Sequence, residues 1–189
     1  MKRTRLVPLF EMGRPNARPL LFLDFDGVLC VGPYGARHVL SSSPPQDLHE
    51  RLWHPTAVTA LLLVLAEHRP QIILTTSWLR RLDRNAIANV FRRTGLAEVD
   101  ASLHPVWSAP ARLGESRLDA IESWLTAAYA GERFVVLDDI RSGSSLRDSR
   151  LDAVGCVLLC DVAVGLHAGH LSFIRQALGL CQVVDACGS

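Results

Sequence analysis

The chain has 189 residues, 49% of them hydrophobic, which is enough for one well-buried domain and gives little reason to expect two. Its 20 basic and 19 acidic residues leave a formal net charge of +1, so no global field recruits nucleic acid or an anionic membrane. The longest strongly apolar run, residues 57–66, is too short for a membrane-spanning helix, which needs roughly 20 residues.

The N-terminal segment is basic but lacks the features of a secretory signal. Pro8 and Glu11 interrupt what would have to be its apolar core, and no small-residue cleavage site follows. Five cysteines form no CxxC pair, and an odd count without a secretory signal indicates reduced thiols and argues against a zinc site. We therefore expect a cytoplasmic protein that does not associate with membranes.

Short apolar runs predict strands that are buried on both faces. They are residues 19–24 (PLLFLD), 71–76 (QIILTT), 133–139 (RFVVLDD) and 155–161 (GCVLLCD). Helical patterns occupy residues 54–68, 79–95, 116–131 and 167–179, with Ser116 as a plausible N-cap. Strands that alternate with helices indicate a Rossmann-like, three-layer α/β/α sandwich around a parallel sheet of about five strands.

One segment breaks this alternation. Residues 31–53 are rich in Gly, Ser and Pro, which is typical of a mobile loop or flap after the first strand. We expect a single domain over 1–189 with its core at about 19–179, a loosely held tail at 180–189 and no large cap domain. Without a large cap, the crevice would stay open to bulky substrates.

The ends of three predicted strands carry polar residues, and ligands of open α/β sheets bind beyond these ends. The residues are Asp24 and Asp26 after the first strand, Thr75 and Thr76 after the second, and Asp138 and Asp139 after the third. Two carboxylates about 4 Å apart repel by about 4 kcal/mol at an effective dielectric of about 20, so such a cluster needs a cation. Oxygen-only ligands favour a hard ion, and Mg²⁺ is the expected one.

Simpler readings exist for each of these motifs. DFDG alone could be an Asx turn, either aspartate of the 138–139 pair could cap a turn, and the threonines could be ordinary β-branched strand residues. The coincidence of all three motifs at predicted strand ends favours a site. An EF-hand loop is disfavoured because Gly27, Val28 and Leu29 stand where further oxygen ligands would be needed.

These motifs resemble those of the haloacid dehalogenase-like (HAD) phosphatases. DFDGVL (24–29) resembles their first motif, ILTT (73–76) the second and VVLDD (135–139) the acidic fourth, in the right order along the chain. A closer likeness links TTSW (75–78), RLDAIESWL (117–125) and DVAVGL (161–166) to small bacterial and phage HAD domains related to those of multifunctional RNA-repair proteins.

The resemblance implies a role for each residue of the first two motifs. Asp24 would be the nucleophile that forms an aspartyl-phosphate, and Asp26 would be the general acid for the leaving oxygen and then the base for water. Gly27 would let the chain turn beside the substrate. Thr75 would donate its hydroxyl to the phosphoryl group, and Thr76 would make a further contact to the substrate.

The resemblance also implies how Mg²⁺ is held. Its ligands would be the carboxylates of Asp24, Asp138 and Asp139 and the backbone carbonyl of Asp26. The sequence departs from the family at the third motif, where most members use a lysine, because the only lysine here is Lys2. Arg117 is the best substitute and Arg112 the second choice, although an arginine grips phosphate with a different geometry.

The leading interpretation is a Mg²⁺-dependent phosphomonoesterase for a small or macromolecular phosphorylated substrate, such as a nucleic-acid end or a phosphoprotein. The acid at Asp26 favours phosphoryl transfer over dehalogenation. The alternatives are a non-catalytic phosphate-binding or interaction module, suggested by the missing lysine, and a phosphotransferase that uses an alcohol in place of water.

Other residues that could have suggested a function are assigned surface, capping or core roles. Arginines 80, 81, 84, 92 and 93 are typical of a solvated helix face, so nucleic-acid contact is possible but not favoured. His167 and His170 are expected to have surface or capping roles. Trp78 is assigned to the core and not to the site.

Overall fold

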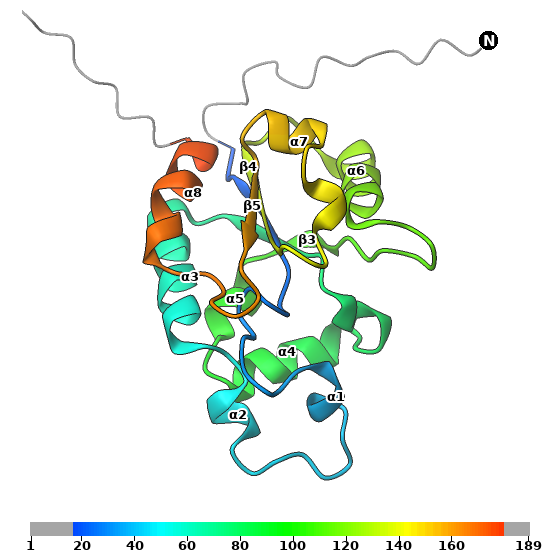
Figure 1. The fold of residues 1–189 in the computed structure, drawn as a ribbon, viewed down its shortest axis with the longest axis vertical. Coiled ribbons are helices and arrows are strands. Elements are labelled where there is room, and N and C mark those ends of the chain that lie inside the picture. The colour runs from blue at the N-terminus through cyan, green and yellow to red at the C-terminus, as the bar shows by residue number, and fades with distance from the viewer. Residues whose placement is uncertain (1–16, 180–189) are drawn as a thin grey trace, which may run out of the picture.

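The computed structural model describes residues 17–179, which form a five-stranded parallel sheet with helices on both faces (Figure 1). The strand order is β3-β2-β1-β4-β5, which places β1 at the centre. The strands are β1 (Leu20–Leu23), β2 (Gln71–Leu74), β3 (Leu103–Ser108), β4 (Phe134–Asp139) and β5 (Val157–Cys160). The predicted three-layer α/β/α sandwich is confirmed.

Eight α-helices of the described chain connect and flank these strands. They are α1 (Ala36–Val39), α2 (Leu48–Arg51), α3 (Pro55–His68), α4 (Arg84–Arg93), α5 (Ala97–Ala101), α6 (Arg117–Ala128), α7 (Arg150–Ala153) and α8 (Leu171–Leu178). Short 3₁₀ turns lie at Ser77–Arg80, Ser144–Leu146 and Ala168–His170.

The central strand β1 separates two apolar layers because its side chains alternate between the two faces of the sheet. Leu21 and Leu23 pack with residues of α3, α4 and α8, whereas Leu20 and Phe22 pack with residues of α6 and α7. The Phe22 ring meets the Trp124 ring of α6 edge to face, with their centroids 5.2 Å apart. A strand buried on both faces reads as a continuous apolar run, and for this reason β1 was predictable.

Strand β3 was not predicted. It lies at an edge of the sheet and pairs only with β2, with a register irregularity between Ile72 and Leu74. None of its residues is fully buried, and Pro105 in its middle cannot donate a ladder hydrogen bond. An exposed edge strand with mixed composition lacks the apolar run that marked the other four.

The helix predicted at 79–95 is wrong at its start. A 3₁₀ turn occupies Ser77–Arg80, and α4 begins only at Arg84. Asp83 causes the break, because its carboxylate accepts a hydrogen bond from the Ala86 backbone N–H at 2.8 Å and so caps a new helix. The predicted N-cap of the next long helix is confirmed, since Ser116 begins α6 with a capping box to Asp119.

The segment 31–53 contains only α1 and α2 as regular structure, each four residues long, so no large cap domain lies between β1 and α3. Its base is held by Cys30, whose Sγ lies 3.0 Å from the Tyr34 carbonyl oxygen and 3.1 Å from the Leu52 carbonyl oxygen, so its single S–H can donate to either. Within the segment the Tyr34 hydroxyl donates to Asp47 at 2.7 Å. Its expected mobility stays a prediction.

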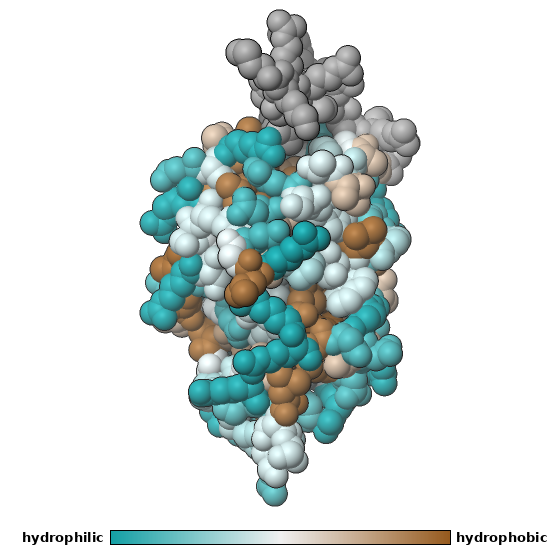
Figure 2. All heavy atoms as spheres, turned by 90° about the vertical axis from the view of Figure 1, so that its right-hand side faces the viewer, coloured by the Kyte–Doolittle hydropathy of each residue, from teal (hydrophilic) through white to brown (hydrophobic). Residues whose placement is uncertain are grey.

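Among residues 17–179, no helix combines the length and the apolar character that crossing a bilayer requires. Figure 2 shows a face on which hydrophilic side chains predominate and hydrophobic ones lie between them. The expectations for the N-terminal segment and for the tail at 180–189 concern residues outside the described range.

Gly27 turns the chain after β1 and lies against β4. Its φ is +73°, and a Cβ at this position would be 2.6 Å from the Asp139 Cβ. Gly155 has the same φ of +73° but nothing within 4 Å of the corresponding point, which makes it a matched control.

We expect Gly155→Ala to lower the free energy of unfolding by about 1–2 kcal/mol, the cost of a left-handed backbone alone. Gly27→Ala should lower it by clearly more, because the new methyl group must also displace Asp139. Urea unfolding of both variants and the parent checks this. Equal losses for the two variants would show that the close approach to Asp139 has no energetic weight.

Candidate active site

The register of the sheet brings the predicted residues to one level. Leu23 at the end of β1 is aligned with Leu74 of β2 and with Leu137 of β4. The next residue on each strand is therefore at the same height, and these residues are Asp24, Thr75 and Asp138. Because all three strands are parallel, their carboxyl ends share one edge of the sheet.

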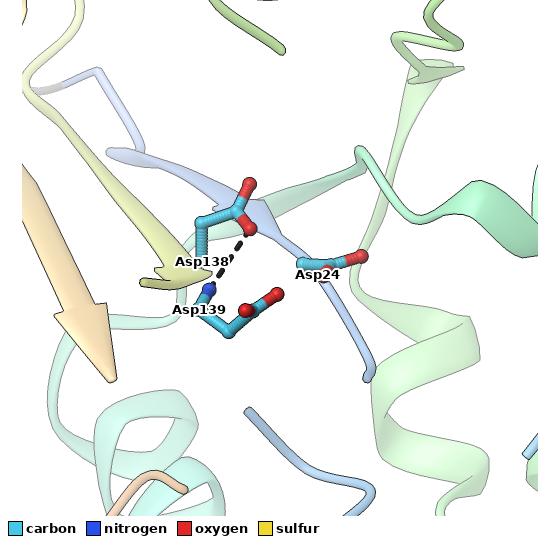
Figure 3. A group of neighbouring side chains, drawn as sticks. All are labelled: Asp24, Asp138 and Asp139. Atoms are coloured by element: carbon cyan, nitrogen blue, oxygen red, sulfur yellow. Dashed lines mark hydrogen bonds between the residues drawn. The ribbon is translucent and has the colours of Figure 1, made fainter. Parts of the chain in front are cut away.

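Three carboxylates form a buried acidic cluster at this edge (Figure 3). Asp24, Asp138 and Asp139 each offer one oxygen, and the three oxygens lie within 4.8 Å of one another. The exposed fractions of these residues are only 1%, 0% and 2%. Oxygen ligands at such spacing fit a hard divalent cation, since like charges buried this closely are costly without a partner.

Arg117 supplies positive charge to the cluster from the first turn of α6. Its Nη2 lies 3.3 Å from Asp24 Oδ1, and its Nε lies 2.6 Å from Asp138 Oδ2. The Nε contact is an ion pair without hydrogen-bond alignment, because neither atom finds a hydrogen-bond partner among the described residues. One guanidinium against three carboxylates leaves a surplus of negative charge.

Arg112, the second choice for this role, lies elsewhere. Its side chain is exposed, and its backbone N–H donates to Glu115 at 2.9 Å. Across residues 17–179 no ion pair joins Arg112 to a carboxylate. The geometry thus brings Arg117, and not Arg112, to the acidic cluster.

Burial dominates the protonation of the cluster. Desolvation raises the pKa of Asp24 to about 6, although the Arg117 guanidinium acts to lower it. Desolvation, reinforced by the Asp24 charge, raises the pKa of Asp138 to about 8, again against Arg117. Without a cation, the cluster does not hold all of its negative charges at neutral pH.

Asp139 is fixed by the turn that follows β4. Its Oδ1 accepts hydrogen bonds from the backbone N–H groups of Arg141 and Ser142 at 2.7 and 3.1 Å. Gly143 completes the turn, since a Cβ there would lie 2.8 Å from the Asp139 carbonyl oxygen. The carboxylate therefore has a set direction before any ligand arrives.

Asp26 stands apart from the acidic cluster. Its half-buried carboxylate is not one of the three clustered groups, and Asp26 Oδ2 accepts a hydrogen bond from Trp78 Nε1–H at 2.9 Å. Burial raises the pKa of Asp26, and the Trp78 hydrogen bond acts to lower it. The metal role predicted for Asp26 used its backbone carbonyl, and that stays a prediction.

Trp78 was set aside as a core residue, and this assignment was incomplete. It is fully buried, but it also touches a site residue. Its position directly after TTS in the sequence was the available signal, because a large side chain with one donor follows a strand end there.

The two threonines differ in their hydroxyl groups. Thr75 is fully buried, and within the described residues its Oγ1 has no hydrogen-bond partner. Thr76 accepts a hydrogen bond from the Trp78 backbone N–H at 3.4 Å and so caps the 3₁₀ turn. A fully buried hydroxyl without a partner beside a pocket is available to a ligand.

A pocket of about 280 Å³ is lined by Arg117, which contacts Asp24 and Asp138, but not by any of the three clustered carboxylates themselves. The loops after β2, β3 and β4 line it, and many of its side chains carry hydroxyl groups. Its lining includes Thr75, Thr76, Ser116, Arg117, Ser142 and Ser145, with Arg80 and Glu115 as further charged residues. The pocket therefore offers hydroxyls and guanidinium groups to an anionic, polar ligand.

The capping role expected for His167 is confirmed, whereas Arg84 is less exposed than the solvated helix face predicted for it. His167 caps a 3₁₀ turn by accepting from the Gly169 N–H at 3.1 Å. Arg84 forms an ion pair with Asp100 and lies over the Trp107 ring.

A Rossmann-like parallel sheet with an acidic cluster at the carboxyl ends of β1 and β4 is typical of the class of HAD-like proteins. The family model described as "HAD domain in Swiss Army Knife RNA repair proteins" matches residues 20–171, and the chain belongs to this family. The predicted resemblance is thereby confirmed. No curated protein and no solved structure matches the chain significantly.

The raised pKa of Asp138 in the acidic cluster predicts that, without a metal ion, the free energy of unfolding depends on pH. Asp138 has a folded pKa of about 8 against an ordinary value of 3.8, so the folded state binds more protons between these values. Stability should therefore fall as the pH rises from about 6.5 to about 8, by at most about 1.4 kcal/mol per pH unit for one proton. Below this range His49, His68 and His170, whose pKa values burial lowers, act in the opposite direction.

Urea unfolding in EDTA at these pH values measures the effect, and Asp138→Asn is the control. This variant cannot lose the proton, so its stability should vary less with pH. Added Mg²⁺ should also reduce the fall in the parent, because a bound cation stabilises the ionised carboxylates. A parent slope that matches the variant's would contradict the assignment.

Proposed function

We propose that the protein is a phosphomonoester hydrolase that acts through an aspartyl-phosphate at Asp24 and depends on a divalent cation, with Mg²⁺ as the expected ion. The proposal rests on the side chains that surround Asp24, in a chain that belongs to a HAD family. The Asp24 carboxylate lies beside the Arg117 guanidinium and at the level of the Thr75 hydroxyl, which has no hydrogen-bond partner among residues 17–179. Under this proposal Asp24 would be the nucleophile, while Arg117 and Thr75, which line the pocket, would supply a positive charge and a hydrogen-bond donor.

The donor set supports a hard cation. Carboxylates of Asp24, Asp138 and Asp139 would hold it, together with the backbone carbonyl of Asp26. Bound there, Mg²⁺ would neutralise the charge that a phosphoryl group brings against the carboxylates.

The protein's own groups account for two chemical steps. A carboxylate oxygen of Asp24 attacks phosphorus, the bond from phosphorus to the leaving oxygen breaks, and Asp26 gives its proton to that oxygen. Water then attacks the aspartyl-phosphate and passes a proton back to Asp26. This hydrolysis breaks the bond between phosphorus and the Asp24 oxygen, releases inorganic phosphate and restores Asp24. Arg117 and the Thr75 hydroxyl would bind the phosphoryl oxygens throughout.

The entrance to the site supports a proposal for the substrate class. The hydroxyl-lined pocket suits a polar leaving group, and because residues 17–179 contain no large cap domain, there is room for a bulky one. Because the family's description refers to RNA repair, a phosphorylated nucleic-acid end is a candidate substrate, beside small phosphate esters and phosphoproteins.

Asp24→Asn should abolish the activity. With p-nitrophenyl phosphate and Mg²⁺ we expect phosphate release by the parent, a loss of at least about a thousandfold in the variant, and a loss of parent activity in EDTA. Asp161→Asn is the matched control, because Asp161 is an exposed aspartate just after β5 and outside the acidic cluster.

The sharper form of this experiment traps the intermediate. Beryllofluoride should bind the parent and not Asp24→Asn, as seen by fluorine NMR. Beryllofluoride binding without turnover of any phosphate ester tested would favour the non-catalytic phosphate-binding module. Transfer of phosphate to an added alcohol would indicate a phosphotransferase.

The two candidate arginines give a second test. Arg117→Ala should reduce kcat strongly, and it should destabilise the fold by about 3–5 kcal/mol because it leaves buried carboxylates without their counter-charge. Arg112→Ala should change neither, since that side chain is exposed. Steady-state kinetics and thermal unfolding check both, and a larger effect at position 112 would reverse the assignment.

A further inference from the structure

The contact between Asp26 and Trp78 joins the predicted general acid to the hydrophobic core. Trp78 Nε1–H donates to Asp26 Oδ2 at 2.9 Å, and Trp78 has an exposed fraction of 0%. The two residues are 52 positions apart, one after β1 and the other after β2. The bond therefore depends on the fold and not on a local turn.

The indole of Trp78 has little freedom to move. It stacks on Trp53 with ring centroids 5.7 Å apart at 19° and meets Phe25 edge to face at 5.2 Å. Trp53 is held in turn, because its Nε1–H donates to Thr94 Oγ1 at 2.8 Å. Rotating Trp78 would disturb this aromatic cluster, so its N–H direction is fixed before a substrate binds.

The donor also distinguishes the two oxygens of Asp26. Oδ2 accepts the indole N–H, and because the carbonyl oxygen of a neutral carboxyl group is its better acceptor, the proton of the neutral acid is favoured on Oδ1. Oδ1 faces Gly35, where a Cβ would come within 3.4 Å of it. Oδ1 therefore faces a glycine, so no side chain at residue 35 blocks the approach of a leaving group to this oxygen.

We propose that Trp78 is a positioning residue that holds Asp26 as the proton donor to the leaving group. This inference rests on the proposed phosphomonoesterase function. It predicts that the indole N–H matters only for leaving groups that need a proton, because a poor leaving group such as an alkoxide requires general-acid help and a dinitrophenolate does not.

The test compares two substrates of the full-length protein with Mg²⁺. Trp78→Phe should lower kcat/KM for ethyl phosphate by about tenfold and for dinitrophenyl phosphate by less than about twofold. Using kcat/KM confines the comparison to steps up to the first release of alcohol, in which Asp26 acts as the acid. Asp26→Asn should show the same selectivity, with a larger loss.

The double variant Asp26→Asn/Trp78→Phe should be little worse than Asp26→Asn alone, because the indole acts through that carboxyl group. Trp124→Phe is the matched control, since Trp124 is also buried and donates its N–H to the Val106 carbonyl away from the site. It should change neither substrate's kcat/KM.

Three outcomes would overturn the proposal: equal losses for both substrates, which indicate a structural role only; no loss for either; or a gain, which indicates that Trp78 holds Asp26 away from the reaction. If Trp78→Phe does not fold, benzothienylalanine at position 78 keeps the indole shape without the donor, and the same expectations apply. A parent that turns over neither ester would instead refute the proposed function, and this inference with it.

Discussion

Repulsion among Asp24, Asp138 and Asp139 is the constraint on which the rest of the site depends. Three buried carboxylates with oxygens within 4.8 Å of one another oppose folding, and Arg117 offsets only part of their charge. The surplus of negative charge disfavours the empty site and favours a ligand that adds positive charge to it. A cation is such a partner, and once bound it makes room for an anionic phosphoryl group.

The sheet makes this arrangement possible at low conformational cost. Parallel strands of equal register deliver their next residues to one edge, so Asp24 and Asp138 need no long loops to meet. The turn after β4 then fixes the direction of the Asp139 carboxylate, because two backbone N–H groups of the turn donate hydrogen bonds to it. Rigid elements thereby set the directions of the charged groups, while the loops after β2, β3 and β4 shape the pocket.

The sequence was informative where one interaction dominated. Strands buried on both faces appear as apolar runs, and carboxylates directly at the ends of such runs stand out from them, so β1, β2, β4 and the aspartates could be predicted. Edge strand β3 could not, because half-exposed positions follow no strong pattern. Neither could the bond from Trp78 to Asp26, since it depends on how β1 and β2 pair. Of the two arginines, Arg117 is the first residue of α6, directly after its capping residue Ser116, and this position at a helix start was the signal that favoured it.

The way in which segment 31–53 is anchored bears on how such a site could acquire a lid. Its base is secured by the Cys30 thiol, whereas Ser41, Ser42 and Ser43 at its tip are exposed. Inserted residues at the tip would extend into solvent and leave the anchoring contacts intact. Gradual growth of this one loop could therefore turn an open crevice into an enclosed chamber, and so narrow the range of ligands without altering the acidic cluster.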